Sequence, residues 1–106
     1  MSIVLSSLHE TTVRAAMDAF QRGDKEDWRA QFAPGAQLYD DGSPRDLDAF
    51  TREALGHELF SSLDYVSPDG LEIRGQFHSD QWGDFRTYFR FTLAAGKVQR
   101  LDIGQA

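Results

Sequence analysis

The spacing of apolar residues changes part-way along the chain, from a helical period in the first half to strict alternation in the second. Over residues 7–22 the apolar positions recur every three or four residues, at Val13, Met17 and Phe20. Charged residues recur every four positions on another face. This spacing predicts an amphipathic helix, and Gly23 follows it where helices commonly end.

A second, short helix is predicted directly after Gly23. Asp24 is a favourable N-cap residue, and Trp28 and Phe32 lie four positions apart, so that both would lie on one side of this helix. The Pro34-Gly35 pair then predicts its end. Both aromatic residues are therefore expected to pack inward.

A short strand, a turn and a third helix follow in the predicted order. Residues 36–40 are typical of a brief strand, and residues 41–44, Asp-Gly-Ser-Pro, are typical of a turn. From residue 46 to about residue 56 the apolar positions return to helical spacing, at Leu47, Phe50 and Ala54. The first half is thus predicted to be helical with one strand.

The second half alternates apolar and polar residues with a period of two. Residues 71–79 and 84–93 both show this pattern, which indicates strands with one buried and one wet face. Turn sequences at 67–70 and 95–97 join them to a predicted strand over 59–66 and to another over 98–103. Helices followed by an antiparallel meander indicate an α+β fold whose helices cover the apolar face of the sheet.

Composition and charge narrow the classes of function. The 106 residues, of which 41% are hydrophobic, predict one globular domain over 1–106. A net charge of -6 argues against binding to nucleic acid, and the absence of cysteine excludes disulfides and thiolate chemistry. The first five residues, Met-Ser-Ile-Val-Leu, lack the basic flank and apolar length of a leader or membrane span, so we expect a cytoplasmic protein with no membrane partner.

The wet face of the sheet is cationic within an otherwise acidic chain. Its long polar side chains are Glu72, Arg74, Gln76, His78, Arg86, Tyr88, Arg90 and Arg100. Two interpretations stay open. In the first, the face is solvated and carries cross-strand ion pairs that each contribute little to stability. In the second, it is the interface of a homodimer built on Arg74, Arg86, Tyr88 and Arg90, because Arg and Tyr are enriched at interfaces.

The chain also resembles a known group of families. The features that carry this resemblance are Gly23-Asp24, Trp28, Phe32, the run Ala-Pro-Gly-Ala-Gln-Leu-Tyr-Asp over 33–40 and the turn Ala-Gly-Lys-Val over 95–98. In this order they resemble the SnoaL-like and ketosteroid-isomerase-like families of the nuclear transport factor 2-like (NTF2-like) superfamily. The resemblance implies a cone-shaped, strongly curved antiparallel sheet covered by N-terminal helices, a cystatin-like α+β barrel. It also implies an internal pocket for a small hydrophobic ligand, often in a dimer.

The resemblance carries over to individual residues only in part. Asp40 falls where ketosteroid isomerases hold the carboxylate that moves a proton between carbons of the substrate. Ala16 and Thr87 fall where those enzymes hold the tyrosine and the protonated aspartic acid that stabilise the oxyanion. Because oxyanion stabilisation is usually the largest contribution to such catalysis, a steroid isomerase of that design is not expected.

Asp40 is also a candidate general base on its own pattern. In a strand over 36–40, Leu38 and Asp40 share a face, so packing under the helices would partly desolvate this carboxylate. Tyr39 points the opposite way by parity. The alternative is that Asp40 belongs to the following turn and is exposed.

The expected ligand contacts are mostly aromatic. Candidates for lining the pocket are Trp28, Tyr39, Phe50, His57, Phe77, Thr87 and Phe89. For each aromatic residue the alternative is a place in the core, and for Thr87 a local hydrogen bond. His57 follows the third helix and is a candidate second acid/base group.

No cofactor or metal is expected, since the chain has no His-Glu-x-x-His spacing and no nucleotide-binding glycine motif. Two functions stay open at this point. The first is a protein that binds a small hydrophobic molecule and acts as a cofactor-independent isomerase, cyclase or related lyase through Asp40. The second is a non-catalytic ligand-binding or dimerisation module.

Overall fold

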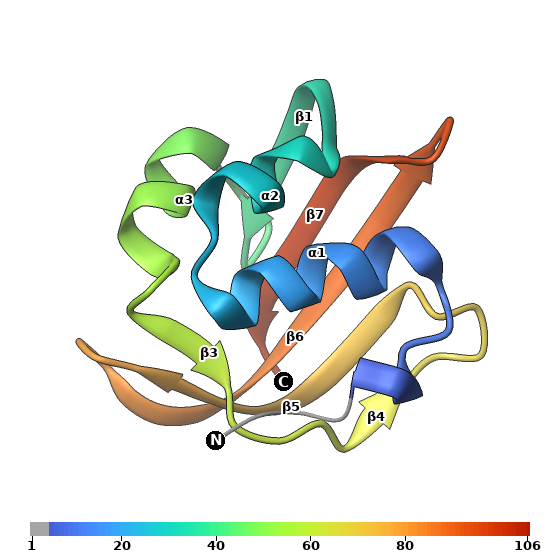
Figure 1. Ribbon diagram of the computed structural model, residues 1–106. Helices are drawn as coiled ribbons and strands as arrows, with labels where there is room; N and C mark the ends of the chain where they lie inside the picture. Colours follow the sequence, from blue (N-terminus) through green and yellow to red (C-terminus); the bar gives the residue numbers. More distant parts are fainter. Residues whose placement is uncertain (1–4) are drawn as a thin grey trace.

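Three α-helices lie on one face of a curved, seven-stranded sheet in the computed structural model, which describes residues 5–106 (Figure 1). Met1–Val4, part of the segment expected to lack a leader, lie outside the described residues. The helices are α1 (Thr11–Arg22), α2 (Lys25–Ala30) and α3 (Leu47–Ala54), preceded by the 3-10 turn η1 (Leu5–Ser7). The strands are β1 (Phe32–Asp40), β2 (Ser43–Arg45), β3 (Glu58–Phe60), β4 (Tyr65–Val66), β5 (Glu72–Ser79), β6 (Gly83–Ala94) and β7 (Lys97–Gln105).

Local capping explains where the first two helices begin and end. The Glu10 side chain accepts hydrogen bonds from the backbone N–H groups of Thr12 and Val13, so α1 begins at Thr11 rather than at residue 7. Gly23 ends α1 with φ 73°, a left-handed conformation that favours glycine. Asp24 then caps α2 by accepting from the Asp27 N–H, as its position in the sequence predicts.

Other boundaries also differ from the predictions, and Ser43 and Pro44, expected in a turn, belong to β2. Phe32 is the first residue of β1 and does not belong to the second helix, and Pro34-Gly35 lies inside β1, where the pairing with β7 shifts register. A bulge of this kind accommodates the missing proline N–H without ending the strand. The predicted strand over 59–66 is two short strands, β3 and β4, which both pair with β5.

The sheet has the order β2-β1-β7-β6-β5-β3, with β4 also paired to β5. All its pairs are antiparallel except β1 with β7, which run parallel. The short hairpin turns of the second half predict antiparallel neighbours, but β1 reaches β7 through a long connection that contains α3 and the other strands, and such a connection permits parallel pairing. The α+β prediction is confirmed, with a sheet that is mixed at this one pair.

The core lies between the helices and the concave face of the sheet. The rings of Phe20 and Trp28 approach to 5.2 Å between centroids, and Phe20 also packs against Phe89 at 5.4 Å. Phe60 contacts Phe89 at 5.1 Å from the far edge of the sheet. Contacts between aromatic side chains therefore join α1 and α2 to β3 and β6.

None of the helices in residues 5–106 combines the length and the apolar character that crossing a membrane requires.

Candidate ligand-binding pocket

A cavity of about 410 Å³ lies between α3, β3 and the concave face of β5, β6 and β7. Such a volume is typical of small-molecule sites. Its lining consists of Asp40, Asp41, Arg45, Phe50, Glu53, Glu58, Phe77, Gln81, Trp82, Phe85, Thr87, Phe89, Ile103, Gly104 and Gln105. The lining divides into an apolar floor and a charged mouth.

Aromatic rings make the floor. Phe77 on β5 stands between Phe85 and Phe89 on β6, with centroid distances of 5.6 and 6.0 Å. Phe50 covers them from α3, and Ile103 completes the floor from β7. Of the aromatic candidates, Phe50, Phe77 and Phe89 are thus brought together in the lining, and Phe85 joins them because the alternation of β6 places it on the same face.

Thr87 lies among these rings with only 4% of its surface exposed. Its hydroxyl oxygen has no hydrogen-bond partner among residues 5–106. Buried hydroxyl groups are nearly always bonded, so an unpartnered one in a cavity wall is available to a ligand. The local hydrogen bond considered as the alternative is not formed.

Asp40 is the last residue of β1 and lies at the rim of the cavity, in register with Ile103 on β7. Its carboxylate accepts a hydrogen bond from Arg45 at 3.0 Å, and its side chain is 39% exposed. Arg45 also bonds Glu53 at 2.9 Å and lies over the Phe50 ring at 5.0 Å. Asp40 therefore belongs to the strand face and not to the following turn, but it shares its charge with an arginine that the sequence pattern did not indicate.

Glu58 is a further carboxylate in the lining, which the sequence pattern did not indicate. It begins β3 and receives a hydrogen bond of 3.2 Å from the Ser79 hydroxyl. Partial burial raises the pKa of Glu58, and the nearby carboxylates of Asp40 and Glu53 add to this effect. The hydrogen bond from Ser79 and the charge of Arg45 oppose it, but the pKa of Glu58 stays above its ordinary value. The sequence favours its neighbour His57 as the second acid/base group, because histidine is the residue type usually expected in that role.

Trp82, like Arg45 and Glu58, is a residue of the lining that the sequence pattern did not indicate. It lies in the turn between β5 and β6, lines the cavity, and is 69% exposed. Ser79 positions this turn, because its hydroxyl oxygen accepts from the backbone N–H groups of Gln81 and Trp82, each at 3.2 Å. A large aromatic residue left exposed beside a cavity is the signal that only the structure reveals.

Comparisons with known proteins support the fold. No family model matches the sequence, and no curated protein matches it. A solved structure of a putative polyketide cyclase from Sinorhizobium meliloti is similar, with TM-score 0.74 and 19% identity over 94% of this chain and 98% of that chain. An NTF2-like protein of unknown function from Cytophaga hutchinsonii has TM-score 0.72 and 7% identity, covering 100% of this chain and 93% of that one.

A protein of unknown function with a cystatin-like fold from Xanthomonas campestris has TM-score 0.71 and 14% identity, over 91% of this chain and 88% of that chain. The chain has an NTF2-like, cystatin-like fold. The fold that the sequence resemblance implied is confirmed. At these identities the similarity extends to the fold and not to a reaction.

Three of the candidate residues lie outside the lining of the NTF2-like pocket. Trp28 is fully buried in the core and donates from its ring N–H to the Thr51 hydroxyl at 3.2 Å. Tyr39 points to the opposite side of β1, as parity predicts, where its ring lies 4.0 Å beneath the Arg100 guanidinium. His57 is exposed and hydrogen-bonds Asp80 at 3.3 Å. The helix face of Trp28 and the strand face of Tyr39 direct these two side chains away from the pocket, and His57 lies in the turn between α3 and β3.

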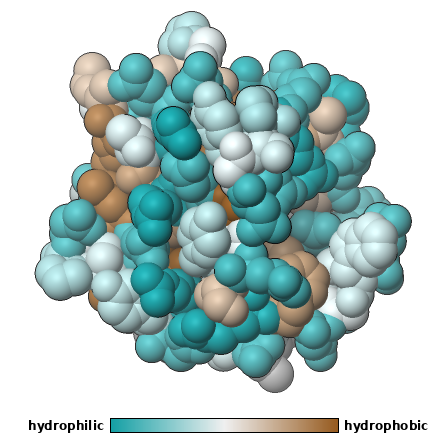
Figure 2. Space-filling model, turned by 180° about the vertical axis from the view of Figure 1, so that it is seen from behind, coloured by the Kyte–Doolittle hydropathy of each residue, from teal (hydrophilic) through white to brown (hydrophobic). Residues whose placement is uncertain are grey.

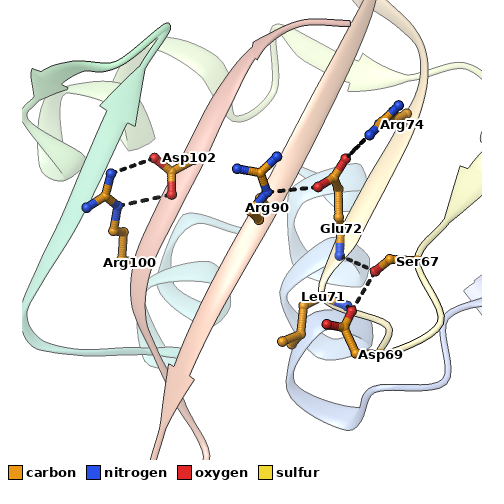
Figure 3. Close-up of polar contacts among 8 residues, drawn as sticks. All are labelled: Ser67, Asp69, Leu71, Glu72, Arg74, Arg90, Arg100 and Asp102. Carbon is orange, nitrogen blue, oxygen red and sulfur yellow. Dashed lines mark hydrogen bonds and ion pairs between the residues drawn. The ribbon is translucent and has the colours of Figure 1, made fainter.

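The helix-free face of the NTF2-like sheet is largely hydrophilic, with hydrophobic side chains gathered toward one side of the view (Figure 2). Figure 3 shows its charges in pairs: Arg90 bonds Glu72 at 2.8 Å, and Arg100 bonds Asp102 at 2.9 Å. Glu72 also bonds Arg74. Each arginine that the sequence pattern places on this face therefore bonds a carboxylate of the same chain, with Arg74 and Arg90 sharing Glu72 and Arg86 bonded to Asp64.

The described part of the chain contains no group of three His, Asp or Glu side chains placed to hold a metal ion.

Proposed function

We propose that this protein binds a small apolar molecule in the cavity under α3 and acts on it as a cofactor-independent isomerase or cyclase. The observation that carries this proposal is that one cavity with an aromatic floor is lined by both Asp40 and the unpartnered hydroxyl of Thr87. A base at the rim and a hydrogen-bond donor on the floor are the two groups that proton transfer next to a carbonyl requires.

In the proposed reaction the Asp40 carboxylate takes a proton from the carbon next to a substrate carbonyl. The electron pair of that C–H bond moves into the carbonyl, and the enolate oxygen accepts a hydrogen bond from Thr87. The proton then returns from Asp40 to another carbon. Alternatively, the enolate carbon attacks a second carbonyl and closes a ring, and the alkoxide formed from that carbonyl takes the proton from Asp40. The rings of Phe50, Phe77 and Phe89 would hold the apolar part of the substrate.

The fold neighbours from Sinorhizobium meliloti and others that bear the name putative polyketide cyclase are compatible with this class of reaction. The two oxyanion donors of ketosteroid isomerases are replaced here by Ala16 and Thr87. A single hydroxyl therefore replaces two donors, and we expect a modest rate and a substrate other than a steroid.

The second candidate is a binding module without catalysis. It is favoured by the ion pair between Asp40 and Arg45, because one oxygen of this carboxylate already accepts a charge-assisted hydrogen bond from the guanidinium at 3.0 Å, a contact that gives Asp40 a structural role at the rim. In this case the cavity would hold its ligand and Asp40 would help to shape the rim.

The Asp40→Asn variant separates the two candidates. Turnover of the enones in a panel of hydrophobic enones and hydroxyketones is followed by the change in their ultraviolet absorbance, and turnover of the hydroxyketones by chromatography. Binding of the same compounds is measured by calorimetry. The enzyme proposal predicts that the variant binds the active compounds but turns them over at least about a hundredfold more slowly, because general bases contribute roughly 10² to 10⁴ in rate. Equal turnover by the variant and the unmodified protein would overturn the role of Asp40, and binding without turnover in both would establish the second candidate.

We also propose that the helix-free face pairs with a second copy of the chain through the surface around Arg74, Arg86, Tyr88 and Arg90. Tyr65 is one of its exposed large apolar residues and lies against the Arg74 guanidinium at 4.6 Å. Exposed aromatic rings and planar guanidinium groups are characteristic of interface centres.

A further inference from the structure

The mouth of the cavity carries more negative charge than a neutral ligand explains. Four carboxylates line it, from Asp40, Asp41, Glu53 and Glu58, against the single guanidinium of Arg45. This leaves a formal excess of three negative charges around a site whose floor is apolar. A ligand with its own carboxylate would be repelled at this mouth, and a ligand with a positive charge would be attracted.

We propose that the pocket selects ligands in which a protonated amine is joined to an apolar body, with the ammonium group held at the mouth by Glu58 and Trp82. This inference names the ligand class of the pocket and so rests on the proposed binding function. It adds a charge requirement that the apolar floor alone does not impose.

Two of the four mouth carboxylates, Asp41 and Glu58, form no ion pair within residues 5–106, and of these two Glu58 is the one that is partly buried. Arg45 is bonded to Asp40 and to Glu53, and within residues 5–106 Glu58 forms no ion pair. Its one side-chain contact is the hydrogen bond from Ser79, which occupies one of the two carboxylate oxygens. Because the side chain is half-buried, solvent screens its charge less than that of a surface carboxylate.

Trp82 is placed beside Glu58 by the same serine. Ser79 donates to Glu58 and accepts from the backbone N–H of Trp82, so one buried hydroxyl ties the carboxylate to the turn that carries the ring. A tryptophan face is the aromatic surface that attracts organic ammonium groups most strongly. An apolar ligand requires neither a carboxylate nor an exposed indole in the lining of its pocket, whereas an ammonium group interacts with both.

Thr87 gives an independent indication that the cavity receives a polar ligand. Its hydroxyl is buried on the floor, and it lacks a partner within the described residues. A ligand that spans the cavity would therefore meet a hydrogen-bonding group among the phenylalanine rings and negative charge at the mouth. The ligand class is an amine whose apolar body carries one further polar group, such as a carbonyl or a hydroxyl.

The test compares three probes with the same body and different head groups: 4-phenylbutylamine, 4-phenylbutan-1-ol and 4-phenylbutanoate. Their dissociation constants are measured by calorimetry at low salt. We expect the amine to bind at least about tenfold more tightly than the alcohol, since a hydrogen bond to a charged group is worth about one factor of ten or more in affinity. The carboxylate should bind most weakly, and added salt should reduce the preference for the amine.

Two matched variants locate the preference. Glu58→Gln should bring the amine to within about threefold of the alcohol while leaving the alcohol affinity unchanged. Glu26→Gln removes the same charge from an exposed position on α2, away from the cavity, and should keep the full preference. Trp82→Leu, at an exposed turn position, should weaken the amine more than the alcohol and serves as the second variant if Glu58→Gln does not fold.

The outcomes distinguish the two levels of the proposal. If none of the three probes binds, the proposed binding function itself fails. If the alcohol binds as tightly as the amine, or if Glu58→Gln keeps the preference for the amine, the pocket binds apolar ligands but the amine inference is overturned.

Discussion

The Ser79 hydroxyl donates a hydrogen bond of 3.2 Å to the Glu58 carboxylate from the directly paired position on the neighbouring strand. The same oxygen accepts the backbone N–H groups of Gln81 and Trp82. Ser79 is almost fully buried, so these contacts are shielded from solvent. One side chain thus connects the acid at the pocket mouth to the turn that bears the exposed indole.

Replacing Ser79 by alanine should therefore affect both stability and the pocket. Two backbone N–H groups of the turn lose their acceptor, which we expect to lower the free energy of unfolding by about 1–2 kcal/mol. Loss of the donated bond should also raise the pKa of Glu58 further, because that bond lowers it in the native protein. Urea unfolding measures the first effect and a carboxyl-carbon NMR titration the second.

Ser43→Ala is the control for this substitution, since Ser43 is exposed on β2. It should change the free energy of unfolding by less than about 0.5 kcal/mol. An unchanged Glu58 titration in Ser79→Ala would show that the Ser79 hydroxyl does not bond Glu58 in solution.

Glu58 should make the protein less stable as the pH rises. Partial burial raises the pKa of Glu58 in the folded state, with Asp40 and Glu53 adding to the effect and Arg45 and Ser79 opposing it. A carboxyl whose pKa is raised on folding favours the native state below its unfolded pKa, and this contribution is lost as the pH rises through the folded value. Glu58→Gln cannot ionise, so it should be more stable relative to the unmodified protein at pH 7 than at pH 4.

The measurement is the difference in the free energy of unfolding between the two proteins at each pH. Glu26→Gln, on the solvent side of α2, should show no such change of sign or slope. A difference for Glu58→Gln that is the same at both pH values would contradict the raised pKa of Glu58.

The helical and strand periods predicted most of the architecture because burial on one face imposes them directly. The alternation of Phe85, Thr87 and Phe89 predicted the inward face of β6, and the parity of Asp40 with Leu38 predicted the face of β1 that borders the pocket. These inferences need only the period of the chain. They hold because neighbouring side chains on one strand have no freedom to exchange faces.

The charged mouth could not be predicted in the same way. Arg45, Glu58 and Trp82 come from a short hairpin strand, a three-residue strand and a turn, where the pattern of two or three residues does not define a face. The β1–β7 pair joins segments distant in sequence, and no local signal specifies its parallel direction. The spacing of Phe32 from Trp28 fits one helical turn and so predicts a helix at this position. In the structure Phe32 pairs with Val98, which is distant in sequence, and this pairing starts a strand there.

Reversing the charge of the helix-free face tests the proposed dimer. Arg86 is bonded to Asp64, and Arg90 is bonded to Glu72. The double variant Arg86→Glu and Arg90→Glu would place unpaired like charges at the seam, and we expect the mass in solution to fall from about twice to once the chain mass. Light scattering coupled to size-exclusion chromatography measures this change.

Arg14→Glu with Arg52→Glu is the matched control, because both arginines are exposed on helices on the other side of the sheet. This control changes the net charge equally and should keep the dimer mass. The seam is refuted if the Arg86 and Arg90 variant keeps the dimer mass too, or if the unmodified protein is already a monomer.

Thr87 and Thr51 are buried threonines with opposite hydrogen-bonding states. The Thr51 hydroxyl donates to the Leu47 carbonyl at 2.8 Å and accepts from the Trp28 ring N–H at 3.2 Å. The Thr87 hydroxyl has neither a donor nor an acceptor beside it among residues 5–106. The pair therefore provides a bonded reference for an unbonded group in the same core.

Replacing Thr87 by valine should stabilise the protein and weaken its pocket. Removing a buried hydroxyl that lacks a partner should raise the free energy of unfolding by about 1 kcal/mol, whereas Thr51→Val, which breaks two hydrogen bonds, should lower it by about 1–2 kcal/mol. Urea unfolding of both variants measures the two changes in stability. Binding of a hydroxyketone measures the effect on the pocket, and we expect Thr87→Val to lower its affinity by about fivefold or more. If Thr87→Val destabilises the protein as Thr51→Val does, the Thr87 hydroxyl already has a hydrogen-bond partner in the free protein and is not available to a ligand. If Thr87→Val stabilises the protein but leaves hydroxyketone binding unchanged, Thr87 lines the cavity without contacting the ligand.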